Sequence, residues 1–299
     1  MNDQATRLRG MMESQGAAAA VAEPPHDDQA QRPAARVIAV TSGKGGVGKT
    51  NLALNLAIVL QRMKLRVCLV DANPGLSNVD LLCGLNGYWN LSHVVTGARS
   101  LPEIVLVGPE DVHLVTGAGA LADLADGSID VRDDVLRQLE HLETDHDYLV
   151  VDTGAGMHRS VRNLVEASDV ALVVTTPEPT AIADAYATVK SLSVSPPGSV
   201  MAVVNQAESA SQAKQVLDRM RHTAGLFLHT DIVSGGSIPN DHHVPAAVAR
   251  RSPLVEYAPR SPAAEAIQRL ARRVKSAADG CPTCGGFFRR LPEPHDHAA

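Results

Sequence analysis

The sequence predicts an α/β fold, a doubly wound and mostly parallel sheet covered by helices on both faces. Short, nearly uninterrupted apolar runs alternate with helix-length segments along the middle of the chain. Strands of this kind are typical of parallel sheets that are buried on both faces. A glycine-rich turn follows the first apolar run and leads directly into a helical segment. These two observations give the fold class.

Each predicted element has a local reason. The strands are runs dominated by valine, isoleucine and leucine, whereas the intervening segments are too long and too polar on one face to be strands. We expect strands at 37–40, 67–70, 112–115, 148–151, 170–174 and 200–204. We expect helices at 49–63, 131–142, 158–167, 180–193, 209–224, 242–251 and 262–277.

The composition is that of a soluble globular protein. The 299 residues carry a net charge of -6, with 44% hydrophobic and 20% charged residues, which fits one domain of about 200–250 residues plus tails. We expect no membrane span, because no apolar stretch reaches about 18–20 residues. The N-terminus has no apolar core of a secretory signal, and the four cysteines exclude a disulfide scaffold. A cytoplasmic location is therefore expected.

The glycine-rich turn has the spacing of a phosphate-binding loop. It fits the pattern G-x-x-x-x-G-K-[ST] and lies between a strand and a helix, as that loop requires. Its glycines let backbone N–H groups curl around phosphate oxygens, and the following helix N-terminus favours negative charge. Lys49 is expected to reach the β and γ phosphates. The expected nucleotide-binding residues here are Gly43, Lys44, Gly45, Gly46, Val47, Gly48, Lys49, Thr50 and Asn51.

Two aspartates end predicted strands beside this loop. Asp71 follows the strand at 67–70, and Asp152 follows the strand at 148–151. The carboxyl ends of parallel strands open onto the ligand crevice of such a sheet. A carboxylate there can hold Mg²⁺ directly or through water, as phosphoryl transfer requires. We therefore expect Mg²⁺ to be held by Thr50, Asp71 and Asp152.

A lysine directly after the first glycine makes the loop resemble that of the MinD/ParA family of ATPases, which carries this deviant form. The resemblance covers residues 36–277 and implies a MinD-like P-loop NTPase fold. It implies that Lys44 crosses an ATP-bridged homodimer and contacts the partner's nucleotide. It also makes the segment at Asp152 similar to the Walker B and switch II segment, in which Gly154 lets the backbone approach the γ-phosphate.

The switch I segment departs from the family pattern. The family has D-x-D where this sequence has Asp71, Ala72 and Asn73, and its second aspartate orients the attacking water. Asparagine can hydrogen-bond water but cannot act as a base. We therefore expect ATP binding with slow hydrolysis to ADP and phosphate, with Lys44, Asp71, Asn73 and Asp152 as the catalytic group. The resemblance further implies that Asn205 reads adenine and that Pro239 packs around it.

Within this family, residues 71–85 and 238–264 are most similar to the FlhG/FleN branch, which controls flagellar number and placement. The N-terminus also matches the DQAxxLR motif of that branch. The resemblance implies that this segment, a short amphipathic helix, docks on an FlhF-type GTPase and stimulates GTP hydrolysis. The partner-binding residues would be Asp3, Gln4, Ala5, Leu8 and Arg9. Another implied partner is a flagellar master transcription activator.

The chain is therefore expected to comprise four parts: a partner-binding segment at 1–14, a flexible linker at 15–35, the ATPase domain at 36–277 and a flexible tail at 278–299. Cys281 and Cys284 could bind zinc together with His295 and His297, or form an exposed dithiol. The run FFRRL at 287–291 has a membrane-surface composition, with a solvated end as the alternative. Asp241 could cap the helix at 242–251, and His242 and His243 are interpreted as helix surface.

Two other functions remain open at this point. An Mrp-type iron–sulfur carrier would use the same deviant loop and a CxxC pair, but that pair is expected inside the domain body and not after its last helix. A division-site or DNA-partition ATPase would leave the N-terminal motif without a role. The net negative charge also disfavours partition by DNA coating, which depends on lysine and arginine.

Overall fold

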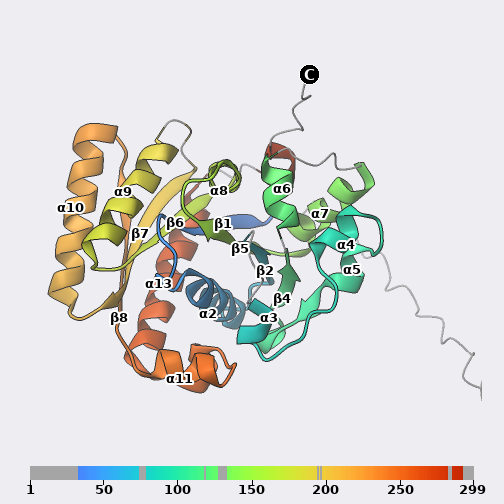
Figure 1. Cartoon of the computed structure of the whole chain (residues 1–299), viewed down its shortest axis with the longest axis horizontal. Coiled ribbons are helices and arrows are strands. Elements are labelled where there is room, and N and C mark those ends of the chain that lie inside the picture. Colours follow the sequence, from blue (N-terminus) through green and yellow to red (C-terminus); the bar gives the residue numbers. More distant parts are fainter. Residues whose placement is uncertain are drawn as a thin grey trace, which may run out of the picture. The chain divides into compact units, whose positions relative to one another are not determined.

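A single mixed sheet forms the centre of the protein, as seen in the computed structural model (Figure 1). The structure describes residues 33–73, 79–117, 119–126, 133–193, 195, 197–281 and 285–291. The strands are β1 (Arg36–Ser42), β2 (Val67–Ala72), β3 (Leu106–Val107), β4 (His113–Thr116), β5 (Tyr148–Ala155), β6 (Val170–Thr175), β7 (Ser199–Ala207) and β8 (Ile232–Pro239). The sheet order is β3-β4-β2-β5-β1-β6-β7-β8. Only β3 is antiparallel among these strands, which confirms the predicted fold class.

Helices cover both faces of the sheet. They are α2 (Lys49–Arg62), α3 (Val79–Leu82), α4 (Leu91–Val95), α5 (Leu101–Ile104), α6 (Ala120–Asp126), α7 (Asp133–Asp145), α8 (Arg159–Glu166), α9 (Pro179–Leu192), α10 (Ala210–Leu228), α11 (His243–Ala249), α12 (Leu254–Tyr257) and α13 (Pro262–Gly280). Short 3-10 turns lie at Pro109–Asp111 and Phe288–Arg290. None of the helices described in these ranges is long and apolar enough to cross a membrane.

Alternate side chains of the strands supply two separate cores. Ile38, Val40 and Val150 pack with α2 and α13 on one face, whereas Val37 and Leu149 pack with α6 and α7 on the other. The helices α9 and α10 extend this second face over β6, β7 and β8 (Figure 1). The near-continuous apolar strands therefore serve two faces at once, as the sequence pattern predicts.

All six predicted strands and all seven predicted helices are present, with their ends shifted by a few residues. β8 is a strand that the sequence did not predict. The same is true of β3 and of α6. The predicted segments at 1–14 and most of 15–35 lie outside the described residues.

The membrane-surface interpretation of residues 287–291 is wrong. Phe287 and Phe288 are buried among the residues of α7 and β5, and Leu291 is buried beside them. Both carboxylate oxygens of Glu143 accept backbone N–H groups, from Phe287 at 3.0 Å and from Phe288 at 3.1 Å. Arg289 forms an ion pair with Glu140. This part of the tail is therefore packed on the sheet and its apolar side chains do not face lipid.

The exposed-dithiol interpretation of the tail fails for Cys281, which is buried. Its Sγ lies 3.8 Å from the carbonyl oxygen of Asp169, and its own carbonyl accepts a hydrogen bond from Arg36 at 2.8 Å. Cys284, His295 and His297 lie outside the described residues, so the zinc expectation is not tested there.

Candidate nucleotide-binding site

The phosphate loop joins β1 to α2 at the carboxyl edge of the sheet. Gly46 and Gly48 have φ angles of 79° and 86°, a left-handed conformation that glycine adopts without steric cost. A Cβ atom added at Gly45 or Gly46 would meet none of the described chain within 4 Å, so this side of the loop is open. α2 begins at Lys49, directly after the loop. Its first N–H groups and its dipole therefore favour an anion here.

Lys49 and Asp152 form a buried pair beneath the loop. The side chain of Lys49 is 8% exposed, that of Asp152 is 0% exposed, and the Lys49 Nζ atom lies 3.6 Å from Oδ1 of Asp152. Neither carboxylate oxygen has a hydrogen-bond partner among the described residues. Burial raises the pKa of Asp152 to about 6, although Lys49 and Thr50 lower it; Asp71 adds a smaller rise. Buried polar atoms are normally hydrogen-bonded, so this carboxylate is suited to receive a cation.

Asp71 lies beside Asp152 on the neighbouring strand, since the two are paired residues of β2 and β5. Asp71 is also buried. Its Oδ1 atom accepts the backbone N–H of Asn73 at 3.0 Å, which fixes the start of the switch I segment relative to β2. The structure thus brings the two carboxylates together, near the end of β2 and within β5, which continues three residues past Asp152.

Most of the predicted phosphate-site residues line one cavity of about 360 Å³. It joins the loop to the switch I residue Asn73, so these two segments face the same space. The predicted residues that line it are Lys44, Gly45, Gly46, Gly48, Lys49, Thr50, Asn51 and Asn73.

Lys44 points away from this loop to the start of α9. Its Nζ atom forms an ion pair with Glu178 at 2.7 Å and a hydrogen bond to Thr180 Oγ1 at 3.0 Å. Lys44 and then Thr180 lower the pKa of Glu178. Nothing in the sequence indicates this contact, because Glu178 lies 134 residues further along the chain. Glu178 and Thr180 are therefore site residues that the sequence analysis missed.

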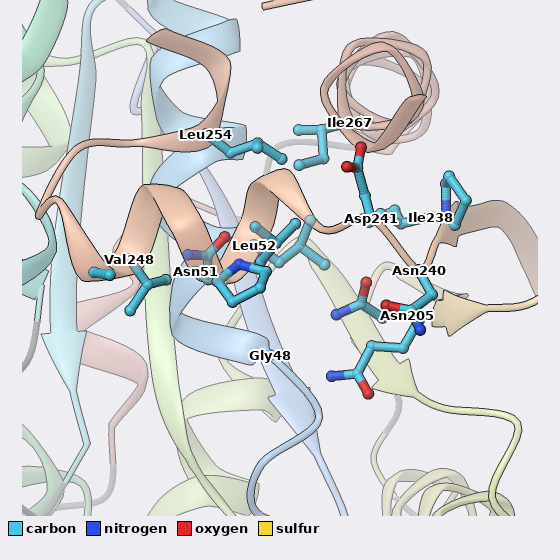
Figure 2. A pocket seen from close by; sticks show the side chains of 15 residues that line it. Gly48, Asn51, Leu52, Asn205, Ile238, Asn240, Asp241, Val248, Leu254 and Ile267 are labelled. Carbon is cyan, nitrogen blue, oxygen red and sulfur yellow. The ribbon is translucent and has the colours of Figure 1, made fainter. Parts of the chain in front are cut away.

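A second cavity, of about 480 Å³, adjoins the loop and is mainly apolar (Figure 2). It lies between the start of α2, the end of β7 and the β8–α11 connection. Leu52, Ile238, Leu254 and Ile267 form apolar walls. Polar groups come from Asn51, Asn205, Gln206, Asn240 and Asp241, and Pro239 also lines the space.

Asn205 connects the wall of this cavity to the phosphate loop. Its Nδ2 atom donates a hydrogen bond to the carbonyl oxygen of Val47 at 2.8 Å. The predicted adenine-reading residues Asn205 and Pro239 thus lie together, next to Gly48. A mainly apolar cavity with a few amide groups has the chemistry of a site for a purine base.

The site residues fit a nucleotide with Mg²⁺. The loop is open on one side, and Asp152 offers two oxygens that accept no hydrogen bond from the described residues. Carboxylates and hydroxyls are the protein ligands that Mg²⁺ prefers. Gly154 is the second-last residue of β5, and Gly156, which follows the strand, has a φ of 96°. The predicted partner residues Asp3, Gln4, Ala5, Leu8 and Arg9 lie outside the described residues.

Comparison with known proteins adds the family. The sequence profile of ParA, described as NUBPL iron-transfer P-loop NTPase, matches residues 34–275. The chain belongs to this family of P-loop NTPases. The match spans the whole sheet and every segment of the phosphate and base cavities.

Two characterised relatives match over most of their length. The antiactivator FleN of Pseudomonas aeruginosa is 36% identical over 242 residues, which are 81% of this chain and 86% of that protein. The flagellum site-determining protein YlxH of Helicobacter pylori is 30% identical over 314 residues, covering 97% of this chain and 98% of that protein.

Solved structures share the fold. The MinC:MinD cell division protein complex of Aquifex aeolicus has a TM-score of 0.65 at 25% identity and covers 81% of this chain and 96% of that one. The septum site-determining protein MinD of Pyrococcus horikoshii, complexed with Mg-ADP, has a TM-score of 0.66 at 22% identity and covers 82% and 97%. The MinD-like fold expected from the sequence is therefore confirmed.

Proposed function

We propose that the protein is an ATP-dependent dimeric switch that regulates the number and placement of flagella. The observation that carries this proposal is the full-length similarity to the flagellum site-determining protein YlxH, together with the similarity to the antiactivator FleN. The intact phosphate loop and its Lys44 supply the chemistry of a switch. Its proposed location is the cytoplasm.

The ligand of the switch is ATP with Mg²⁺. The loop residues from Gly43 to Asn51 would hold the phosphates, while Asn205 and Pro239 would border the adenine. Thr50, Asp71 and Asp152 would hold Mg²⁺, which neutralises phosphate charge during phosphoryl transfer. Lys49, already 3.6 Å from Asp152, would bring a second positive charge to the same place.

Lys44 is the residue through which ATP would promote dimerisation. In the single chain it is bound to Glu178 and Thr180, and its side chain is 37% exposed. A surface ion pair of this kind contributes little to stability, because water and salt screen it. The phosphates of a nucleotide in a second copy carry more negative charge than one carboxylate. They can therefore compete for Lys44 and draw it across the interface.

Asn73 would make the switch slow to reset. It lines the phosphate cavity, where a water must be oriented for attack. Its amide can hydrogen-bond that water but cannot accept its proton. The ATP-bound dimer is therefore expected to persist, so that its partners act on a long-lived state.

The proposed partners are an FlhF-type GTPase and a flagellar master transcription activator. The first would be reached through Asp3, Gln4, Ala5, Leu8 and Arg9, whose motif includes glutamine and arginine of the kind that stabilise attacking water and phosphate charge in GTPase activation. The second fits the antiactivator role of the relative from Pseudomonas aeruginosa.

An iron–sulfur carrier is less well supported. Cys281, half of the CxxC pair, is buried and its Sγ lies 3.8 Å from a backbone carbonyl. A transferable cluster shared by two copies needs cysteines that are exposed at an interface. A colourless protein purified without oxygen would agree with the switch and disagree with the carrier.

ATP-dependent dimerisation tests the switch directly. Light scattering after a sizing column should show dimers with Mg-ATP and monomers without it. Lys49→Ala should abolish the dimer by preventing phosphate binding, and Lys44→Ala should abolish it while ATP still binds. Lys214→Ala is the matched control, because that lysine is 77% exposed on α10 and pairs with Asp218 of its own helix. Dimerisation that is unchanged in Lys44→Ala would refute the proposal.

The flagellar role needs a second measurement. Deletion of the gene should change the number or position of flagella seen by electron microscopy while cell division stays normal. Restoration by the natural gene but not by the Lys49→Ala variant would connect the role to the nucleotide. A division defect with unaltered flagella would instead support the division-site ATPase.

A further inference from the structure

Three side chains able to bind a metal lie together where β8 leads into α11. They are Asp241, His242 and His243, and their ligand atoms all lie within 4.8 Å of one another. Oδ1 of Asp241 is 2.7 Å from Nδ1 of His243 and 3.9 Å from Nδ1 of His242. The sequence analysis interpreted the two histidines as helix surface, because no cysteine or other histidine lies near them in the sequence.

Asp241 is a fixed anionic ligand. Its side chain is 2% exposed and its oxygens accept the backbone N–H groups of His243 and Ala263, each at 3.0 Å. These two hydrogen bonds hold the buried carboxylate in one position, as the preorganised ligand of a metal site must be.

The two imidazole rings are the other candidate metal ligands, and both are accessible to solvent. Their ring centres are 4.0 Å apart, and one nitrogen of each ring lies within 4.8 Å of the other and of an Asp241 oxygen. The side chain of His243 is 35% exposed and that of His242 is 86% exposed. An ion can therefore reach the cluster, and His242 can rotate to present either nitrogen. The ion would take the place of the proton that His243 now shares with Asp241.

We propose that Asp241, His242 and His243 bind a divalent transition-metal ion, with Zn²⁺ as the natural ligand. Two imidazole nitrogens and one carboxylate oxygen form a donor set that suits Zn²⁺, whereas Mg²⁺ prefers oxygen ligands and water. Three protein ligands leave a coordination position for water. The site is separate from the Mg²⁺ residues at the phosphate loop and stands at the rim of the base cavity, which Asp241 also lines (Figure 2).

The experiment is a metal titration of the full chain, purified without a histidine tag and in the absence of nucleotide. Zn²⁺ binding is measured by calorimetry, and Co²⁺ is used as a spectroscopic probe. We expect a site whose Co²⁺ spectrum shows nitrogen and oxygen ligation without a thiolate charge-transfer band. His242→Ala should weaken the affinity about tenfold or more, and its melting temperature without metal should not change, because the side chain is exposed.

Two further variants complete the test. His243→Ala should weaken binding at least as much as His242→Ala, and His222→Ala, which removes an exposed histidine of α10, should bind as the natural protein does. Equal Zn²⁺ affinity in His242→Ala, His243→Ala and the natural protein would overturn the proposal. A thiolate band retained in both histidine variants would assign the metal to cysteines and would likewise overturn it.

Discussion

Replacement of the buried carboxylate Asp152 by asparagine should stabilise the protein in the absence of nucleotide. Burial raises the pKa of this group from 3.8 to about 6. Each pKa unit corresponds to about 1.36 kcal/mol, so holding the charge at pH 7 destabilises the folded state by roughly 3 kcal/mol. Asparagine keeps the shape and removes the charge. The pKa shift already includes the attraction of Lys49, which the variant loses, so we expect a gain of about 1–3 kcal/mol.

The pH dependence identifies the cause. Between pH 3.8 and about 6 the folded protein holds a proton on Asp152 that the unfolded chain has released. The contribution of this group to stability therefore increases as the pH falls through that window. The natural protein should approach the Asp152→Asn variant on acidification. The difference in unfolding free energy should decrease to about half at pH 5 and vanish below about pH 4.

Urea unfolding at pH 7 and pH 5, with and without Mg-ATP, measures the unfolding free energy of both proteins and its dependence on pH and nucleotide. Without nucleotide the variant should have the higher midpoint at pH 7. With Mg-ATP the natural protein should gain stability by ligand binding, whereas the variant, which lacks the Mg²⁺ ligand, should gain little. Asp218→Asn, at a half-exposed aspartate of α10, is the matched control and should change neither midpoint. A variant less stable than the natural protein at pH 7, or a difference that does not depend on pH, would refute the reasoning.

Three further changes test other parts of the site and the fold. Asn73→Asp should raise the rate of ATP turnover by supplying the missing carboxylate, and equal phosphate release by the two proteins would mean that another group orients the water. Glu178→Gln should free Lys44 and lower the ATP concentration that gives half-maximal dimerisation by up to about fivefold, since exposed ion pairs contribute at most about 1 kcal/mol; an unchanged concentration would exclude competition for the lysine. Glu143→Gln should lower the unfolding free energy by about 1.5–3 kcal/mol in thermal melts, as expected for hydrogen bonds to a charged group, whereas Glu140→Gln, which loses only a surface ion pair with Arg289, should lower it by less than about 1 kcal/mol.

The six strands were predicted correctly because each is a continuous apolar run that can be recognised from its own residues. A run such as the one in β6 is apolar on both sides and can only be buried between two helical layers. β8 was missed because its centre, Ser234 to Ser237, contains two glycines and two serines. A Cβ at Gly235 would lie 2.9 Å from the Ala202 carbonyl oxygen and 3.2 Å from a Leu270 methyl group. The neighbouring strand and α13 therefore require the small residues that hide this strand from a hydrophobicity pattern.

The same distinction applies to the site. The phosphate loop is one continuous segment, so its spacing alone predicts its geometry. The two aspartates were predicted from the rule that the carboxyl ends of parallel strands open onto the ligand crevice. The structure brings them together because the strand register pairs Asp71 with Asp152 across β2 and β5. The partners of Lys44 depend instead on how distant segments pack after folding, since Glu178 lies 134 residues away. No short-range pattern carries that information.

The tail illustrates how one composition can serve two environments. Two phenylalanines, two arginines and a leucine suit a lipid surface, yet here the aromatic rings are buried and Arg289 pairs with Glu140. Glu143 on α7 is only 3% exposed, and a buried carboxylate requires hydrogen-bond donors, which the backbone of Phe287 and Phe288 supplies. Moving both rings to a membrane would first cost about 3–6 kcal/mol, the free energy by which their burial stabilises the fold. It would also leave Glu143 without these hydrogen-bond donors. Residues 287–291 therefore stabilise α7, and a membrane contact would have to use another surface.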